Sequence, residues 1–453
     1  MPDIYLVIGG SGFVGRHIVQ QLLDRGDTVS VLDLVQRYHD VPFYHADITD
    51  QAQVAEVLRK TGTTCIIHTA SPPAALKLET GDLYYRVNVL GTKSIIAAAQ
   101  ATGVRKLVFT SSAGVVWTGA SLIDVDERTP VPEKPNDPYT HSKAQAEEAV
   151  LAANGKDGLL TVALRPAGIF GPGDNQQLLP GLYQVYERGQ THFQIGDNTN
   201  MFDWTYVGNV AAAHLLAADR LDTPPPAPVL SDLPEVPKSP EEVPPLTAAE
   251  EDLVRYALPP VSATTGAHRT PTSAARPLGP YVTPPPNAEG LLAAFNGPAP
   301  RNIPAVRTRF DPLSDPTIAR SKLHAPHTSP LQVAGQVFFI TNGEPVGFWD
   351  LPRLVWYHFD KMYPEKAKAR RKGIWVLPKD LGMALATGAE WWGWLTRTDP
   401  TFTRFKVGYS CESRWFNIEK ARRVLGYEPR VGLEEGIRLT MEAWKEFKAT
   451  QKQ

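Results

Sequence analysis

The chain has 453 residues, of which 42% are hydrophobic and 21% charged, so it can bury a large core and is not globally disordered. Its 46 basic and 48 acidic residues give a net charge of −2, which argues against a nucleic-acid partner because such binders carry an excess of basic residues. Two cysteines and an opening strand pattern in place of a signal peptide predict a reducing, intracellular compartment and no cysteine-rich metal site.

The first half of the chain alternates short β-branched runs with segments of helical periodicity. Residues 4–8, 28–32, 65–68, 107–110 and 160–164 are predicted strands, and residues 13–25, 51–60, 83–102 and 139–153 are predicted helices. Strands separated by helices predict a parallel sheet with helices on both faces, which binds ligands at the carboxyl ends of its strands. We therefore expect an α/β fold with a Rossmann-type doubly wound parallel sheet over residues 1–221.

A glycine-rich turn lies between the first predicted strand and the first predicted helix. Gly9, Gly12 and Gly15 have the GxxGxxG spacing, which lets the backbone approach a pyrophosphate at a helix N-terminus. Asp33 ends the second strand, where a carboxylate can accept hydrogen bonds from the adenosine ribose and repels a 2′-phosphate. The sequence therefore predicts NAD binding, with NADP as the alternative if Arg37 dominates.

Asp47 and Ile48 follow a third strand pattern. The Asp47 carboxylate could lie near the adenine amino group of the cofactor. The alternative is that Asp47 is the N-cap of the next helix.

Tyr139 and Lys143 are spaced YxxxK in a predicted helix, so their side chains share one face, one turn apart. The Lys143 ammonium would lower the pKa of the Tyr139 phenol and make it a usable general acid or base. Ser112 ends the preceding strand and could hydrogen-bond the oxygen that exchanges the proton. Ser111 is expected to face the other way, because side chains alternate along a strand.

Residues 222–330 hold 24 of the chain's 41 prolines. Each proline removes a backbone donor and keeps its predecessor extended, so this stretch predicts a disordered proline-rich insert. Partner binding by the prolines is the alternative. Beyond the insert, residues 337–340 predict a strand and residues 348–363 and 433–448 predict helices. We expect residues 331–453 to form a smaller C-terminal substrate lobe.

These motifs together resemble an extended short-chain dehydrogenase. Residues 9–15, 88–92, 110–112, 139–143 and 165–172 carry that resemblance. Residues 68–72, 202–210, 338–345 and 420–427 are similar to the 3β-hydroxysteroid dehydrogenase/isomerase family, in its decarboxylating sterol-4-alpha-carboxylate 3-dehydrogenase branch. The resemblance extends over about 1–221 and 331–448 and leaves the insert out.

The resemblance implies roles for individual residues. Tyr139 would be the acid/base, Lys143 its activator and Ser112 the hydroxyl partner. Asn88 would tie the backbone near the catalytic strand, or be a buried structural residue. No metal is implied, and the implied cofactor-binding residues are Gly9, Gly12, Phe13, Val14, Gly15, Asp33, Asp47, Ile48, Thr69, Ala70, Ser71, Asn88, Tyr139, Lys143, Pro166 and Ala167.

The reaction that the resemblance implies is NAD(P)-dependent oxidation of a sterol 3β-hydroxyl, on a 4α-carboxysterol that then loses carbon dioxide. Oxidation of a 3β-hydroxysteroid without decarboxylation is one alternative. A catalytically silent NAD-binding regulator is another, and the complete set of Ser112, Tyr139 and Lys143 argues against it. Expected partners are the sterol, a second copy of the chain or a sterol C-4 demethylation complex, and no nucleic acid.

Residues 374–395 combine tryptophans and leucines with Lys379, Asp380 and Glu390, so the segment cannot span a bilayer. We predict that it lies in a membrane interface, peripherally at the cytosolic face of the endoplasmic reticulum, which the resemblance also implies. The alternative is that its aromatic residues pack the substrate lobe. The basic residues that could favour anionic lipid are Lys366, Lys368, Arg370, Arg371 and Lys372.

Overall fold

The structure is a computed structural model. It describes residues 2–73, 81–127, 129–133, 136–175, 178–224, 332–369, 373–398, 402–418 and 420–450. The predicted insert at 222–330 lies outside the described residues apart from 222–224, and so do three of the five predicted lipid-binding residues, Arg370, Arg371 and Lys372.

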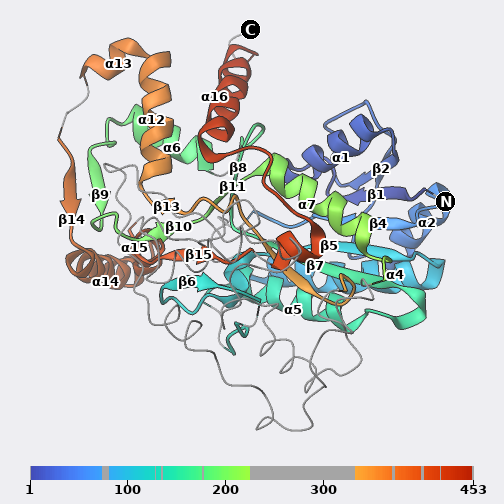
Figure 1. The fold of residues 1–453 in the computed structure, drawn as a ribbon. Helices are drawn as coiled ribbons and strands as arrows, with labels where there is room; N and C mark the ends of the chain where they lie inside the picture. Colours follow the sequence, from blue (N-terminus) through green and yellow to red (C-terminus); the bar gives the residue numbers. More distant parts are fainter. Residues whose placement is uncertain are drawn as a thin grey trace, which may run out of the picture.

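Seven parallel strands form the central sheet, in the order β12-β7-β5-β4-β1-β2-β3 (Figure 1). The chain runs from β1 outward to β3 and then returns to β4 on the other side of β1, which creates the crevice where such sheets bind dinucleotides. The predicted α/β fold with a doubly wound parallel sheet is confirmed. The strands are Ile4–Ile8 (β1), Thr28–Asp33 (β2), Phe43–His45 (β3), Cys65–His68 (β4), Lys106–Thr110 (β5), Leu160–Pro166 (β7) and Val337–Ile340 (β12).

Helices cover both faces of this sheet, and the alternation of side chains along β1 shows how. Tyr5 and Val7 join the apolar cluster that contains residues of α1 (Phe13–Arg25) and α7 (Val207–Arg220). Leu6 and Ile8 join the opposite cluster, under α2 (Gln51–Thr61), α4 (Thr92–Thr102) and α5 (Pro138–Ala152). Because both faces are buried, the strands are nearly continuous apolar runs, and this made them recognisable in the sequence.

The single helix predicted at residues 83–102 is wrong in detail. The structure divides it into α3 (Gly81–Tyr84), a π-helix at Tyr85–Gly91, and α4. A π-helix inserts one residue into the helical register, which apolar periodicity does not reveal. Gly91 permits the close approach there, because a Cβ at this position would lie 2.6 Å from Ile48 Cδ1.

Shorter strands build a second layer beside the carboxyl end of the sheet. β6 (Leu122–Val125), β10 (Met201–Phe202), β13 (Val346–Gly347) and β15 (Arg414–Phe416) form a four-stranded sheet. β8 (Gly168–Phe170) pairs with β11 (Trp204–Tyr206), and β9 (Phe193–Ile195) pairs with β14 (Trp375–Leu377). The helices of this region are α6 (Leu178–Glu187), α12 (Asp350–Met362), α13 (Pro364–Ala369), α14 (Lys379–Thr396), α15 (Arg404–Cys411) and α16 (Leu433–Thr450).

β12 links the two halves of the described chain. It follows residue 331 in sequence, yet it pairs in parallel with β7 at the edge of the central sheet. The sheet therefore takes strands from both sides of the proline-rich stretch. The division into 1–221, 222–330 and 331–453 stays a prediction.

Candidate active site

The turn between β1 and α1 is so tight that two of its glycines, Gly9 and Gly15, leave no room for a Cβ atom. Gly9 has φ +84° and donates its N–H to Leu32 O at 2.8 Å. A Cβ on Gly15 would lie 2.1 Å from Gly9 O, and a Cβ on Gly9 would lie 2.6 Å from Ala70 N. Gly12 caps α1 without a side-chain hydrogen bond, so the first N–H groups of the helix stay available to a ligand.

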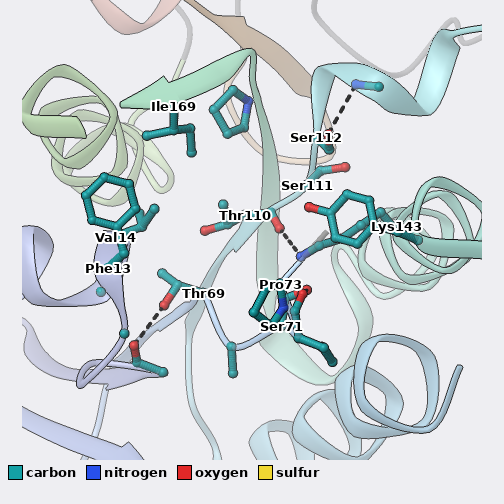
Figure 2. A pocket seen from close by; sticks show the side chains of 18 of the residues that line it. Phe13, Val14, Thr69, Ser71, Pro73, Thr110, Ser111, Ser112, Lys143 and Ile169 are labelled. Atoms are coloured by element: carbon teal, nitrogen blue, oxygen red, sulfur yellow. Dashed lines mark hydrogen bonds between the residues drawn. The ribbon is translucent and has the colours of Figure 1, made fainter. Parts of the chain in front are cut away.

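A cavity of about 830 Å³ begins at this turn, a volume in the range of small-molecule and cofactor sites. Its walls come from the carboxyl ends of β1, β2, β4, β5 and β7 and from the second layer. Figure 2 shows Phe13 and Val14 on one side of the cavity and Ser112 and Lys143 on the other. All of the predicted cofactor-binding residues line it except Asn88.

Tyr139 and Lys143 enter the cavity from the start of α5. Asp137 caps this helix by accepting a hydrogen bond from Thr140 N at 2.9 Å, and Pro138 occupies its first turn. Lys143 follows Tyr139 by one turn, is 2% exposed, and donates from Nζ to Thr110 O at 2.8 Å (Figure 2). The cap thus fixes the start of α5 and with it the place of both side chains.

Burial shifts both groups toward their neutral forms. It lowers the pKa of Lys143 to about 7, although the Glu147 carboxylate acts in the other direction. Burial also raises the pKa of Tyr139, as does the charge of Asp137, while a hydrogen bond with Ser112 lowers it. The predicted lowering of the Tyr139 pKa by Lys143 is therefore not found in the protein alone, where desolvation is the largest influence and raises the pKa.

Ser111 and Ser112, which directly follow β5, have different surroundings. Ser112 Oγ accepts a hydrogen bond from Gly114 N at 3.2 Å, and the Ser112 side chain lies close enough to lower the pKa of Tyr139. Ser111 Oγ instead donates to Glu147 Oε2 at 2.6 Å, in a buried cluster in which Glu147 is paired with Arg165 at 2.6 Å. The two side chains therefore make different contacts, although both residues line the cavity.

Asp33 and Arg37 both contact Ser11 in the glycine turn. Asp33 Oδ2 accepts from Ser11 N at 3.0 Å and Oδ1 accepts from Leu34 N at 2.7 Å. Arg37 Nη1 donates to Ser11 O at 3.0 Å. Both side chains line the cavity, so a carboxylate and a guanidinium are available at the same end of the site.

Asp47 is not the N-cap of α2. Asp50 has that position and accepts from Ala52 N and Gln53 N. Asp47 Oδ1 accepts from Thr49 N at 2.9 Å and from Thr49 Oγ1 at 2.8 Å, and its residue lines the cavity. The N-cap alternative therefore fails, while the contact with adenine stays a prediction.

Asn88 lies behind the cavity wall. Its Nδ2 donates to Ser142 Oγ at 2.9 Å, and Ser142 Oγ donates to Tyr139 O at 2.7 Å. Among the described contacts, Asn88 therefore forms a hydrogen bond with a side chain of α5, and the expected hydrogen bond with the strand backbone is not found. The reason is the π-helix, which brings Asn88 against that helix.

The sequence did not identify the other end of the cavity. Four aromatic side chains and Arg414 come together there from β10, α15, β15 and the loop after β5. These residues are far apart in the chain and follow no spacing motif, so only the fold brings them together. The aromatic residues are Trp117, Phe202, Phe405 and Tyr409.

Comparisons with known proteins agree with this architecture. Residues 6–233 match the 3-beta hydroxysteroid dehydrogenase/isomerase family. The chain is 37% identical to the decarboxylating sterol-4-alpha-carboxylate 3-dehydrogenase of Schizosaccharomyces pombe, over 98% of each chain. It is 33% identical to the enzyme of the same name from Saccharomyces cerevisiae, over 98% of this chain and 97% of that one.

Solved structures share the fold at lower identity. UDP-glucose 4-epimerase of Thermus thermophilus, crystallised with NAD, superposes with a TM-score of 0.54 at 20% identity, over 97% of this chain and 98% of that one. An epimerase of Methanothermobacter thermautotrophicus reaches a TM-score of 0.60 at 16% identity, over 100% of this chain and 95% of that one. At these identities the likeness concerns the fold alone.

Proposed function

Because the chain belongs to the 3-beta hydroxysteroid dehydrogenase/isomerase family, we propose that it oxidises the 3β-hydroxyl of a 4α-carboxysterol with NAD and releases carbon dioxide, leaving a 3-ketosterol. The full-length likeness to fungal enzymes of that name supports the substrate class. The observation that carries the chemistry is the meeting of Ser112, Tyr139 and Lys143 in one cavity with the glycine turn.

The residues present fit a dinucleotide. A Cβ on Gly9 or Gly15 would clash with neighbouring backbone, so only glycine allows the tight turn that lets the backbone approach a pyrophosphate. Asp33, at the end of β2, is placed to bind the adenosine ribose. When bound, NAD supplies the acceptor for the hydride that leaves carbon 3, and its oxidised ring adds a positive charge to the site. Phe13, Val14, Pro166 and Ala167 would line the cofactor.

Proton transfer would fall to Tyr139. In the protein alone its phenol is neutral, so the positive charges of Lys143 and of the cofactor would be needed to make the tyrosinate accessible. The tyrosinate would take the proton of the 3β-hydroxyl while Ser112 holds the same oxygen. Asn88 and Ser142 would position Tyr139 through its backbone carbonyl.

Decarboxylation needs no further base. Once carbon 3 is a ketone, a carboxylate on carbon 4 belongs to a β-keto acid. The bond between carbon 4 and the carboxylate breaks, its electron pair moves into the enolate of the ketone, and a proton from solvent restores the C–H bond.

Product analysis tests this proposal. Purified protein would be incubated with NAD and either a 4α-carboxysterol or the same sterol without the carboxylate, and the products identified by mass spectrometry. We expect a 3-ketosterol that has lost the mass of carbon dioxide from the first substrate. A ketone that keeps its carboxylate, or exclusive use of the second substrate, would favour the plain 3β-hydroxysteroid dehydrogenase. Cofactor binding with no product from either would favour the regulator.

We also infer peripheral attachment to the endoplasmic reticulum membrane. Among the described residues no helix is long and apolar enough to cross a bilayer. Four tryptophans of β14 and α14 nevertheless face solvent: Trp375, Trp391, Trp392 and Trp394 are 68%, 62%, 61% and 77% exposed. The alternative that they pack the substrate lobe is therefore wrong. Assembly as a homodimer or in a sterol C-4 demethylation complex is a further part of this proposal.

A further inference from the structure

Glu147 is a buried carboxylate directly behind the reaction cavity. It lies on α5 one helical turn after Lys143 and is 3% exposed. Lys143 and Ser111 line the cavity, whereas Glu147 does not. Its Oε2 accepts hydrogen bonds from Ser111 Oγ at 2.6 Å and from Arg165 Nε at 3.0 Å, and its Oε1 accepts one from Arg165 Nη2 at 2.6 Å. Both carboxylate oxygens are therefore held by donors other than Lys143.

This carboxylate joins three elements of the fold. Ser111 directly follows β5, Arg165 belongs to β7, and Glu147 belongs to α5. The hydrogen bond from Lys143 Nζ to Thr110 O, at 2.8 Å, crosses the same junction between α5 and the end of β5. Glu147 therefore fixes the helix that carries Lys143 against the strand end to which the amine is bonded.

The stability of the fold does not explain why this charge is buried. Taking two charges out of water costs about as much as their attraction returns, so a buried ion pair is weak evidence for stability. Ala146 and Val150, on the same part of α5, are fully buried without any charge. The helix can thus pack on the sheet through apolar side chains, and the site beside Glu147 is the place to look for its role.

The surroundings of Lys143 contain little negative charge. Its Nζ lies 5.0 Å from the centroid of the Phe109 ring. Burial and the charge of Lys143 lower the pKa of His68 to about 3, so that side chain is neutral. Of the two carboxylates nearby, Asp137 acts on Tyr139, and Glu147 acts on Lys143. The ionisable residues on the surrounding elements are Tyr84 of α3, His68 of β4, Arg165 of β7, Tyr139 and Glu147 of α5, and Asp137 at the N-cap of α5.

We propose that Glu147 is a positioning residue for proton transfer, which keeps the Lys143 side chain in its ammonium form beside Tyr139. This rests on the proposed function, in which that ammonium stabilises the tyrosinate. An ammonium has three N–H donors, and the described contacts use one of them, so the others stay available to a ligand. Because Ser111 and Arg165 hold both of its oxygens, Glu147 contributes its charge without drawing the amine out of the cavity.

The electrostatics of the site support this role. With the Glu147 charge in place, the pKa of Lys143 is about 7, so the amine is divided between its two forms at neutral pH. Without that carboxylate, burial would act unopposed and the pKa of Lys143 would fall further. The neutral amine would then predominate, and it cannot stabilise a tyrosinate.

The test removes the charge together with its counter-ion. The double variant Glu147→Gln/Arg165→Met leaves no unpaired buried charge, so it should keep the fold. Competitive acetylation of the apoenzyme with acetic anhydride at different pH values, with the Lys143 peptide quantified by mass spectrometry, gives the midpoint at which this amine loses its proton. We expect the midpoint to fall by about one pH unit, since a unit charge one helical turn away is removed along with the cation that partly cancels it.

Turnover should follow the charge of Lys143. On the 4α-carboxysterol, kcat of the double variant should fall by about 10-fold at pH 8 and by only about twofold at pH 6, where more of the amine is protonated. The double variant Asp3→Asn/Lys106→Met is the matched control, because it removes a largely buried ion pair of 2.8 Å at the opposite end of β5. The control should leave the Lys143 midpoint unchanged.

Tm and NAD affinity show whether each variant is folded. If Glu147→Gln/Arg165→Met does not fold, Glu147→Asp takes its place, and its midpoint should fall by less, because the charge is moved and not removed. A folded variant whose midpoint and pH profile match those of the unmodified enzyme would overturn the proposal and leave the ion pair with a structural role. Acetylation needs neither sterol nor NAD, so an unmodified enzyme that makes no ketone would refute the proposed function alone, while a lowered midpoint would still show that Glu147 controls the charge of Lys143.

Discussion

Burial shifts the pKa values of Lys143 and Tyr139 in opposite directions. Burial raises the pKa of Tyr139 and lowers that of Lys143 to about 7, so at neutral pH the phenol is neutral and the amine is only partly protonated. An exposed pair would titrate at ordinary pKa values and could not be controlled by binding. If Tyr139 carries the proton transfer proposed above, that step depends on the charges that the ligands bring.

Replacing Tyr139 with Phe should remove turnover and spare the cofactor. We expect kcat to fall by about 10²- to 10⁴-fold, the usual contribution of a positioned acid or base, with NAD affinity changed little. Tyr84→Phe is a matched control, because the Tyr84 ring lies 5.6 Å from that of Tyr139, its hydroxyl donates to Pro73 O, and Tyr84 itself does not line the cavity. Retention of most of the kcat by Tyr139→Phe would refute the acid/base assignment.

Replacing Lys143 with Met should stabilise the apoenzyme while abolishing catalysis. The unfolded lysine keeps its proton up to its ordinary pKa near 10.5, whereas the buried one releases it near pH 7. Unfolding therefore takes up a proton between these values. The destabilising cost is full below pH 7 and shrinks as the pH rises toward 10.5.

The gain from Lys143→Met should follow the same pH dependence. Thermal unfolding at pH 6 should show a Tm increase of at least roughly 2–4 °C, the equivalent of one kcal/mol for a large domain, and the increase should shrink by pH 10. Lys93→Met, on the exposed side of α4, controls for the change in composition. An increase that does not depend on pH would contradict the depressed pKa of Lys143.

Cofactor choice should depend on Asp33. Its carboxylate is held by two backbone N–H groups and would repel the 2′-phosphate of NADP. Asp33→Ala should narrow the ratio of kcat/KM for NAD to that for NADP, because Arg37 stays beside Ser11. The double variant Asp33→Ala/Arg37→Ala should lose the increase in kcat/KM for NADP that Asp33→Ala alone produces. If the unmodified enzyme already prefers NADP, Arg37 and not Asp33 is the determinant.

At the scale of elements, the sequence predicts what is local and apolar. β1, β4 and β12 have the bounds that their β-branched runs predict, and α1 begins and ends where its periodicity does. The strands of the second layer were missed, because β10 and β13 have two residues each and depend on pairing between distant segments. The aromatic end of the cavity was missed for the same reason, because the residues that line it come from segments far apart in the chain.

α14 is a helix whose large apolar side chains point outward. Its buried positions are Gly382, Ala386 and Gly393, which let it pack closely on α15, while its leucines and tryptophans face solvent. A globular helix normally shows the opposite arrangement. The described residues between 366 and 406 also include six basic and two acidic side chains, in a chain of net charge −2, so the surface around α14 suits an anionic bilayer.

Vesicle co-sedimentation should detect this surface. We expect binding to anionic vesicles at low salt, weaker binding at high salt because the charges are screened, and little binding to neutral vesicles. Trp391→Ala with Trp392→Ala, and Gln in place of the five basic residues at 366–372, should each weaken it. Val35→Ala, which trims an exposed apolar side chain elsewhere, is the control. Self-association through α14 would instead appear as a concentration-dependent dimer that the tryptophan changes abolish.

Across the whole molecule, the outward face of α14 and the reaction cavity are separated by one helix. α14 packs on α15, and α15 supplies Phe405 and Tyr409 to the cavity wall (Figure 1). Phe405 is also 45% exposed, so a single side chain borders both the outer surface and the aromatic end of the site. A sterol held in a bilayer beneath α14 would thus meet the aromatic end of the cavity first.

Substrate presentation should therefore separate docking from chemistry. With the sterol in anionic vesicles, Trp391→Ala with Trp392→Ala should lower kcat/KM roughly in proportion to the lost vesicle affinity, because the enzyme must dock before it can extract the sterol. With the sterol in detergent micelles, the same variant should match the unmodified enzyme, since neither tryptophan lines the cavity. Tyr139→Phe should be impaired in both formats. Equal losses of the tryptophan variant in vesicles and in micelles would show that α14 supports the fold of the substrate region and not delivery from the membrane.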